Sequence, residues 1–358
     1  MNNPDLDNPQ LYRQYDSDGM LARIGEMPEQ CQRAWQKAMD FSLPPDYTEI
    51  NKVVILGMGG SAIGGDLVGS LAISEAKLPV LVYRDYNLPA FVDAETLVIA
   101  SSYSGMTEET LSSFEQSLET KAKKLAITAG GKLKDIAEKR NVPFFSIDYK
   151  TQPRAALAFS FLPSLCFLQK LGFIPDKSTD VNEMVKVLQE LSHKIKEGVP
   201  SSDNPAKQLA LRLYGHLPVI YGAGVVSEVA HRWKTQLNEN GKAWAFHEVF
   251  PELNHNAVVG YQFPAELASE IVLVLLNSTY LSERLQLRYQ ITCGLLEQAG
   301  VSYQLVDSVG ASQLSQMMSL VLYGDYISCY LAFLYETDPS PVKGISYLKD
   351  QLAQSKGA

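Results

Sequence analysis

Cysteine is scarce in this sequence and is never arranged in close pairs. The 358 residues include four cysteines, and no two of them form a CxxC motif. Each lies in an apolar or helical stretch, so we expect buried free thiols, which suits a reducing cytoplasm. The four are Cys31, Cys166, Cys293 and Cys329.

Positive charge is also in short supply. Lys and Arg number 31 against 40 Asp and Glu, which gives a formal net charge of −9. This balance argues against nucleic acid and against an anionic membrane as partners. A phosphate group bound by this chain must therefore be held by local donors and not by the overall field.

Long hydrophobic runs are missing as well. The most apolar stretch, 155–171, is interrupted by Ser160, Pro163 and Gln169, so it predicts a buried helix and not a membrane span. The first ten residues, MNNPDLDNPQ, are acidic and polar and have no signal-peptide character. We therefore expect a cytoplasmic protein.

The length and the 46% apolar content suit two domains of about 150 residues each. Residues 1–48 predict an N-terminal helical lead, with a periodic portion at 20–41. Residues 49–175 predict a first α/β domain, 176–202 a polar connecting segment, and 203–358 a second α/β domain with a C-terminal helix. Alternating strands and helices indicate parallel sheets covered on both faces, with ligands beyond the carboxyl ends of the strands.

Eight segments are predicted as strands because they are short, apolar and bounded by turn residues. In the first half they are Val53–Leu56, Pro79–Tyr83, Thr96–Ser101, Lys124–Thr128 and Pro143–Ile147, and in the second half Leu217–Tyr221, Ile271–Leu276 and Tyr303–Val306. Each half opens with a strand, a glycine turn and a helix, which suggests an internal duplication.

The segment 52–67 reads KVVILGMGGSAIGGDL, in which an apolar run ends in glycines at 57, 59, 60, 64 and 65. This pattern predicts a strand, a tight turn and a helix. Glycine permits φ > 0 and lets a ligand approach bare N–H groups, and the helix start adds unpaired donors. The segment therefore predicts an anion site suited to phosphate.

A second polar loop, SSYSGMT at 101–107, follows the strand Thr96–Ser101. Taken alone it fits an ordinary helix cap with turn residues. Beside the loop at Gly59–Ser61 it favours a phosphate monoester held by hydroxyl groups. A dinucleotide site is the rival interpretation, because Gly57, Gly59 and Ala62 fit a loose Rossmann pattern and Asp85 follows the next strand.

Ionisable side chains concentrate between Gln236 and Tyr261. Glu239 and His255 are separated by one loop and are candidates for a base and a second proton carrier, although each is also an ordinary loop residue elsewhere. A zinc site made of His247, Glu248, Glu252 and His255 is disfavoured, because the HExxH spacing is absent and Pro251 interrupts any helix. We predict no metal.

Six motifs, in this order, make the chain resemble the bifunctional phosphoglucose/phosphomannose isomerases, which are built from sugar-isomerase (SIS) domains. They are GMGGSAIGGD at 57–66, SSYSGMTEET at 101–110, PRA at 153–155, NEN at 238–240, ELNHN at 252–256 and PVKGISYLK at 341–349. The resemblance covers nearly the whole chain. It implies two SIS domains, each with a five-stranded parallel sheet flanked by helices.

The resemblance also implies residue roles. Arg154 would stabilise an anionic intermediate, Glu239 would be the base, and His255 would help open the sugar ring from a neighbouring subunit of a homodimer. Lys349 would assist at the ring oxygen, and Met106 stands where the family usually carries Asn. The phosphate would be held by Gly60, Ser61, Ser102, Ser104 and Thr107.

The activity implied is isomerisation of glucose 6-phosphate, and of mannose 6-phosphate, to fructose 6-phosphate through a cis-enediolate, without a cofactor. A sugar-phosphate-binding SIS regulator is the main alternative, although the first 48 residues show no helix-turn-helix. A Rossmann-type oxidoreductase is a more remote one.

Overall fold

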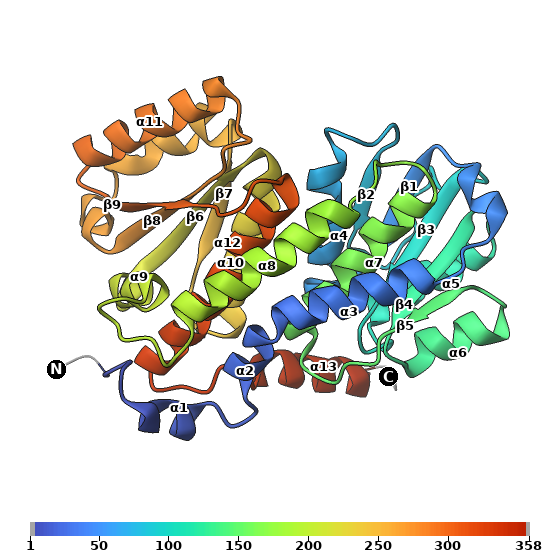
Figure 1. Cartoon of the computed structure of the whole chain (residues 1–358), viewed down its shortest axis with the longest axis horizontal. Coiled ribbons are helices and arrows are strands. Elements are labelled where there is room, and N and C mark those ends of the chain that lie inside the picture. Colours follow the sequence, from blue (N-terminus) through green and yellow to red (C-terminus); the bar gives the residue numbers. More distant parts are fainter. Residues whose placement is uncertain (1–3, 356–358) are drawn as a thin grey trace.

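The computed structural model describes residues 4–355, so residues 1–3 and 356–358, at the outer ends of the predicted lead and of the predicted second domain, lie outside the described chain. Two parallel sheets stand side by side, with a layer of helices between them (Figure 1). The first two helices and the last helix run along one end of the molecule, below this layer in the view of Figure 1.

The first sheet contains five parallel strands in the order β2-β1-β3-β4-β5. Their bounds are β1 Lys52–Leu56, β2 Val80–Tyr83, β3 Thr96–Ser101, β4 Lys123–Thr128 and β5 Phe144–Ser146, close to the predicted ones. This order is that of flavodoxin-like sheets and differs from that of dinucleotide-binding sheets. The order reverses between β1 and β3, so the ligand crevice belongs after these two strands.

Among residues 4–355 the second sheet has four strands, in the order β7-β6-β8-β9, and the prediction of five is wrong for this half. The strands are β6 Leu217–Ala223, β7 Phe246–Phe250, β8 Ile271–Asn277 and β9 Ser302–Asp307. The order repeats that of the first sheet without its last strand. After β9 the described chain enters a long buried helix, whereas the first half continues through a short helix to β5.

In the described part of the chain, one group of helices lies between the sheets and another covers the outer faces (Figure 1). The inner ones are α3 Met27–Asp40, α4 Gly59–Ala72, α7 Leu157–Lys170, α8 Ser178–Ile195, α10 Ser227–Glu239 and α12 Gln313–Leu334. The outer ones are α5 Glu108–Leu118, α6 Gly131–Lys139 and α11 Glu283–Gln298. The others are α1 Pro9–Tyr15, α2 Met20–Gly25, α9 Pro205–Leu213 and α13 Lys343–Ser355, so the periodic portion predicted at 20–41 is two helices.

Alternating residues of β1 separate two hydrophobic cores. Val53 and Ile55 point into a core that joins both halves of the chain, whereas Val54 and Leu56 point into a smaller core under α5 and α6. All four are at most 1% exposed, as expected for a parallel strand covered on both faces. The larger core takes residues from both sheets and from the inner helices, so the halves are packed as one body.

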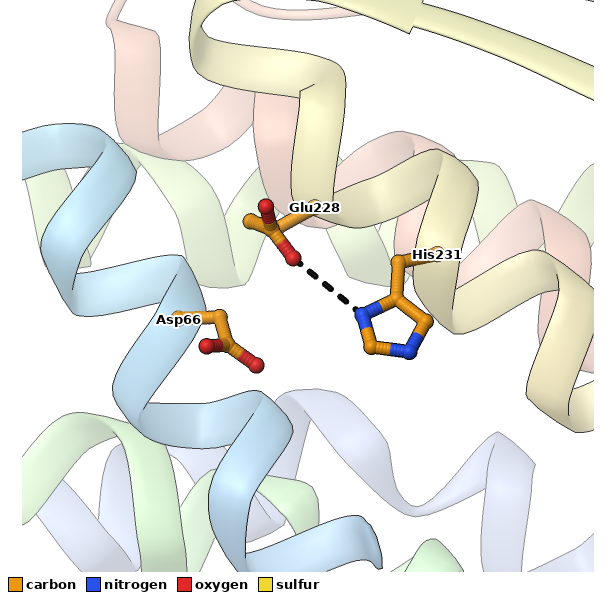
Figure 2. A group of neighbouring side chains, drawn as sticks. All are labelled: Asp66, Glu228 and His231. Atoms are coloured by element: carbon orange, nitrogen blue, oxygen red, sulfur yellow. Dashed lines mark hydrogen bonds and ion pairs between the residues drawn. The ribbon is translucent and has the colours of Figure 1, made fainter. Parts of the chain in front are cut away.

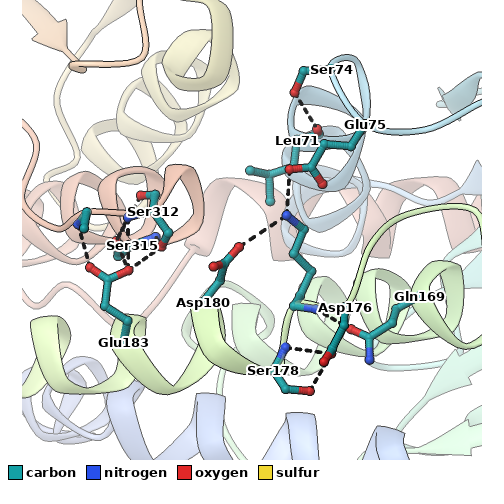
Figure 3. A network of polar contacts seen from close by, with 12 residues as sticks. Leu71, Ser74, Glu75, Gln169, Asp176, Ser178, Asp180, Glu183, Ser312 and Ser315 are labelled. Atoms are coloured by element: carbon teal, nitrogen blue, oxygen red, sulfur yellow. Dashed lines mark hydrogen bonds and ion pairs between the residues drawn. The ribbon is translucent and has the colours of Figure 1, made fainter.

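Helix α8, which spans most of the predicted connecting segment, packs against α12 and α3. Its Glu183 accepts hydrogen bonds from the backbone N–H groups of Ala311 and Ser312 and from the hydroxyls of Ser312 and Ser315, at the start of α12 (Figure 3). A carboxylate suits this place because a helix N-terminus carries unpaired donors and partial positive charge.

Among the described residues one helix, α12, is long and apolar enough to cross a membrane, and 94% of its most apolar window is buried inside the protein. It packs against α8, α9 and α10. The shorter apolar helix α7 is buried as predicted, between α3 and α4. Both are core helices.

Candidate functional site

The first glycine turn joins β1 to α4 with the expected geometry. Gly59 has φ +50°, a value that favours glycine, and the N-cap Met58 makes no side-chain capping bond to the helix. The first N–H groups of α4 are therefore open to an anion. Gly224 repeats the φ of +50° after β6, which supports the suggested duplication.

The hydroxyl loop after β3 lies directly beside this turn. The Oγ of Ser61 accepts a hydrogen bond of 3.1 Å from the backbone N–H of Tyr103, and the hydroxyls of Ser102 and Thr107 are 2.9 Å apart. Ser104 Oγ accepts from the N–H of Met106 at 3.2 Å. The predicted phosphate residues therefore form one contiguous group at the carboxyl ends of β1 and β3.

Gly60 and Met106, which belong to the same two loops, carry no hydroxyl group and have different neighbours. A Cβ on Gly60 would lie 3.1 Å from the carbonyl oxygen of Pro153, so the close packing of this turn on the segment 153–155 favours glycine. Met106, the departure from the family pattern, is 53% exposed, and its sulfur accepts from the N–H of Lys132. Its side chain makes its bond to α6, beside the crevice.

Arg154 connects the two halves of the chain. It lies in a 3₁₀ turn, Pro153–Ala155, and is 4% exposed. Its Nε donates to Asn240 Oδ1 at 2.6 Å, and its Nη2 donates to the carbonyls of Pro339 and Ser340 at 2.8 and 2.7 Å. Its Nη1 lies 3.7 Å from Glu239 Oε2. Burial lowers the pKa of Arg154, and the charge of Glu239 opposes this shift.

Glu239 is the last residue of α10 and lines a pocket of about 690 Å³ between the end of that helix and the start of α13. Lys242 lines the same pocket and donates to the carbonyls of Glu239, Pro339 and Pro341. Burial and the charge of Arg154 lower the pKa of Lys242 to about 8, although carbonyl acceptors favour its protonated form. The base candidate is thus flanked by two cationic side chains.

A buried polar network behind Arg154 was missed by the sequence analysis. Arg232 on α10 donates to Asp325 at 2.6 Å and to the carbonyl oxygen of Arg154 at 3.0 Å, and Gln236 also donates to Asp325. Arg232 and Asp325 are each 1% exposed. The available signal was Asp325, a single acid within the apolar run of α12, because a buried charge requires a partner.

His255 and Lys349 are not brought to this site within the described chain. His255 lies at the end of a 3₁₀ turn, Glu252–His255, and is exposed, as is Lys349 on α13. No hydrogen bond or ion pair joins either side chain to Arg154 or Glu239 among residues 4–355. Helix α13 has no buried residue and exposes Tyr347 and Leu348.

The residues considered as a zinc site from the sequence are not brought together in the described chain either. They are His247, Glu248, Glu252 and His255. Within the described part of the chain, the metal-ligating side chains that come together are Asp66, Glu228 and His231, from α4 and α10. Of the four, only His247 is near them, through ring stacking on His231.

Comparison with known proteins supplies the family. Residues 202–352 match a family described as the bacterial phospho-glucose isomerase C-terminal SIS domain. The chain is 45% identical over 338 residues to a bifunctional phosphoglucose/phosphomannose isomerase of Caldicellulosiruptor bescii, covering 94% of this chain and 100% of that protein. This chain belongs to the bifunctional phosphoglucose/phosphomannose isomerase family. A member from Aquifex aeolicus is 37% identical over 86% of this chain and 92% of its own length.

Solved structures support the fold of this isomerase family member. A hypothetical protein of Thermus thermophilus superposes with a TM-score of 0.73 at 18% identity, over 98% of this chain and 93% of that one. The predictions of an α/β fold with SIS domains and of an isomerase are confirmed, apart from the strand count of the second sheet. The oxidoreductase interpretation is set aside.

Proposed function

We propose that this protein interconverts glucose 6-phosphate and mannose 6-phosphate with fructose 6-phosphate. The observation that carries the proposal is the approach of Arg154 Nη1 to Glu239 Oε2, 3.7 Å, with the turn of Arg154 packed against Gly60 of the phosphate turn, in a chain of this isomerase family. A sugar phosphate is the substrate class named for its relatives.

The phosphate is held by neutral donors. Gly60 and Ser61 present the start of α4, and Ser102, Ser104 and Thr107 present hydroxyls from the adjoining loop. A phosphate monoester offers three oxygens to such donors, and the helix N-terminus favours its charge. Binding at this remote group orients the sugar carbons for reaction.

Glu239 moves the proton between C2 and C1. A positioned base of this kind is worth about 10²–10⁴-fold in rate. Arg154 stabilises the oxygens of the cis-enediolate that forms, since its guanidinium is already buried and held by Asn240. C2 is planar in this intermediate, which removes the one difference between the two aldose phosphates. One pocket therefore serves both epimers, and no redox or metal cofactor is needed for these steps.

His255 and Lys349 assist ring opening, with His255 supplied by the partner of a homodimer. Exposure of the His255 side chain supports its assignment to the partner's site, because a residue that serves a neighbouring site must lie at the surface of its own chain. The exposed apolar side chains of α13, Ile345, Tyr347 and Leu348, offer a surface for that partner. The acidic, cysteine-poor chain suits the cytoplasm.

The test is incubation of the purified protein with fructose 6-phosphate in deuterated water. Deuterium at C2 of both glucose 6-phosphate and mannose 6-phosphate is expected, because the base exchanges its proton with solvent. Formation of only one of the two aldose phosphates would contradict dual specificity. Binding of fructose 6-phosphate, seen as a higher melting temperature, without any exchange would support a regulator instead.

A further inference from the structure

A second group of ionisable side chains lies between α4 and α10, apart from the residues assigned to catalysis. The carboxylates of Asp66 and Glu228 and the imidazole of His231 have ligand atoms that all lie within 4.8 Å of one another. Figure 2 shows the Asp66 carboxylate reaching from α4 toward the Glu228–His231 pair on α10. The mechanism proposed above uses none of the three.

We propose that Asp66, Glu228 and His231 form a binding site for a transition-metal cation, with Zn²⁺ as the best fit. Glu228 and His231 are three residues apart on one helix, the Glu-x-x-His spacing with which helical bundles present two metal ligands on one face. Asp66 adds a third ligand from the opposite helix. Two carboxylates and one imidazole, with an open fourth position, suit zinc.

The distances fit a metal with a small closing movement. Glu228 Oε2 and His231 Nδ1 are 3.2 Å apart. Two ligands at about 2.05 Å on a tetrahedral zinc are separated by about 3.3 Å. The metal would replace the proton shared by these two atoms, while the neutral imidazole keeps a proton on Nε2. Asp66 would close the remaining gap of up to 4.8 Å by rotation of its side chain.

The group combines two carboxylates with one cationic neighbour, Arg84. Asp66 is paired with Arg84, whose side chain is 34% exposed, and it is repelled by Glu228. A divalent ion would attract both carboxylates at once, and Arg84, whose ion pair with Asp66 it would replace, would turn toward solvent.

His247 supports the ligand imidazole from behind. Its ring stacks on that of His231 at 4.7 Å between centroids and 11° between planes. The strand β7 thereby fixes the His231 ring, as neighbours of metal-binding histidines commonly do.

The site would join the two catalytic helices. Helix α4 begins at the phosphate turn and α10 ends at Glu239, and Asp66 and His231 lie along the contact between them. A bound ion would therefore hold the two halves of the chain together independently of substrate.

The experiment is a titration of tag-free, chelator-treated protein with ZnCl₂, followed by calorimetry and by the melting temperature. One ion per chain and a higher melting temperature are expected. His231→Gln and Glu228→Gln should each weaken Zn²⁺ binding at least 10-fold. His216→Gln, which removes an exposed histidine without a carboxylate partner, should bind as the wild type does.

A second readout covers variants that are themselves destabilised. Co²⁺ should give the absorption of a four-coordinate site in the wild type and in His216→Gln, and not in His231→Gln. Crystals soaked in ZnCl₂ should show an anomalous peak among the three side chains. Absence of stoichiometric binding, or binding that His231→Gln and Glu228→Gln leave unchanged, would overturn the proposal.

Discussion

The guanidinium of Arg154 and the carboxylate of Glu239 face each other at 3.7 Å across the boundary between the two halves of the chain. Arg154 reaches this place because its turn packs on Gly60, at the start of α4. Glu239 reaches it because α10 ends there. One buried arginine, Arg154, therefore contacts both the phosphate turn and the base candidate.

Removal of the base should separate binding from turnover. Glu239→Gln keeps the size of the side chain but cannot accept a proton, so kcat should fall about 10²–10⁴-fold. Fructose 6-phosphate should still raise the melting temperature, since the hydroxyl loops are unchanged. Glu190→Gln, on the exposed face of α8, is the matched control. Near-normal turnover of Glu239→Gln would take this residue out of its role.

Ser61 should matter for both affinity and stability. Ser61→Ala removes the acceptor of the Tyr103 N–H and one proposed phosphate donor. An unpaired buried N–H costs about 1–3 kcal/mol, and because this N–H is part-buried the free energy of unfolding should fall by about 1 kcal/mol. KM for fructose 6-phosphate should rise, while Ser70→Ala, further along the same helix, should change neither. Unchanged KM in Ser61→Ala would place the phosphate elsewhere.

Acid should weaken the contact between α8 and α12. Burial would raise the pKa of Glu183, but the hydrogen bonds from Ser312, Ala311 and Ser315 outweigh it and hold the pKa below its unfolded value of 4.5. A depressed folded pKa stabilises the protein above the unfolded value, and this contribution is lost as pH falls through the folded one.

Glu183→Gln should therefore be less stable than the wild type at neutral pH, by about 1 kcal/mol for a charge at a helix N-terminus. The difference should shrink as the pH drops below 4.5, as measured by urea unfolding at several pH values. Glu190→Gln, on the same helix, should follow the wild-type curve throughout. A difference that stays constant with pH would show that the charge of Glu183 is not responsible.

A hybrid dimer tests whether His255 serves a neighbouring site. Glu239→Gln and His255→Asn chains, co-expressed with different tags, give a hybrid in which one site holds both intact residues. About half of the wild-type activity per dimer is then expected, although each variant alone is nearly inactive. An inactive hybrid, or a chain that stays monomeric, would place His255 in the site of its own subunit.

Periodicity predicted the first sheet almost strand by strand, because its strands are apolar on both faces and end in glycine or hydroxyl turns. The strand β7, Phe246–Phe250, was missed. It is an edge strand whose His247 and Glu248 are not buried, so its composition is that of a polar loop. The pairing of β7 with β6 is a tertiary fact that composition does not carry.

The predicted site residues came from short motifs, and the structure adds what motifs cannot contain. The partners of Arg154, namely Asn240, Pro339 and Ser340, lie far from it in sequence, and two of them act through backbone carbonyls. The burial of Arg232 with Asp325 likewise depends on the crossing of α10 and α12. Side-chain identity alone does not reveal such contacts.

The larger core, which draws on both sheets and on the helices between them, bears on how this enzyme responds to heat. Two domains with separate hydrophobic cores can unfold one after the other, whereas two halves that share one core unfold together. Unfolding of one half would expose the apolar core residues of the other half to water. An inactive enzyme with one intact half is therefore not a stable intermediate of this architecture.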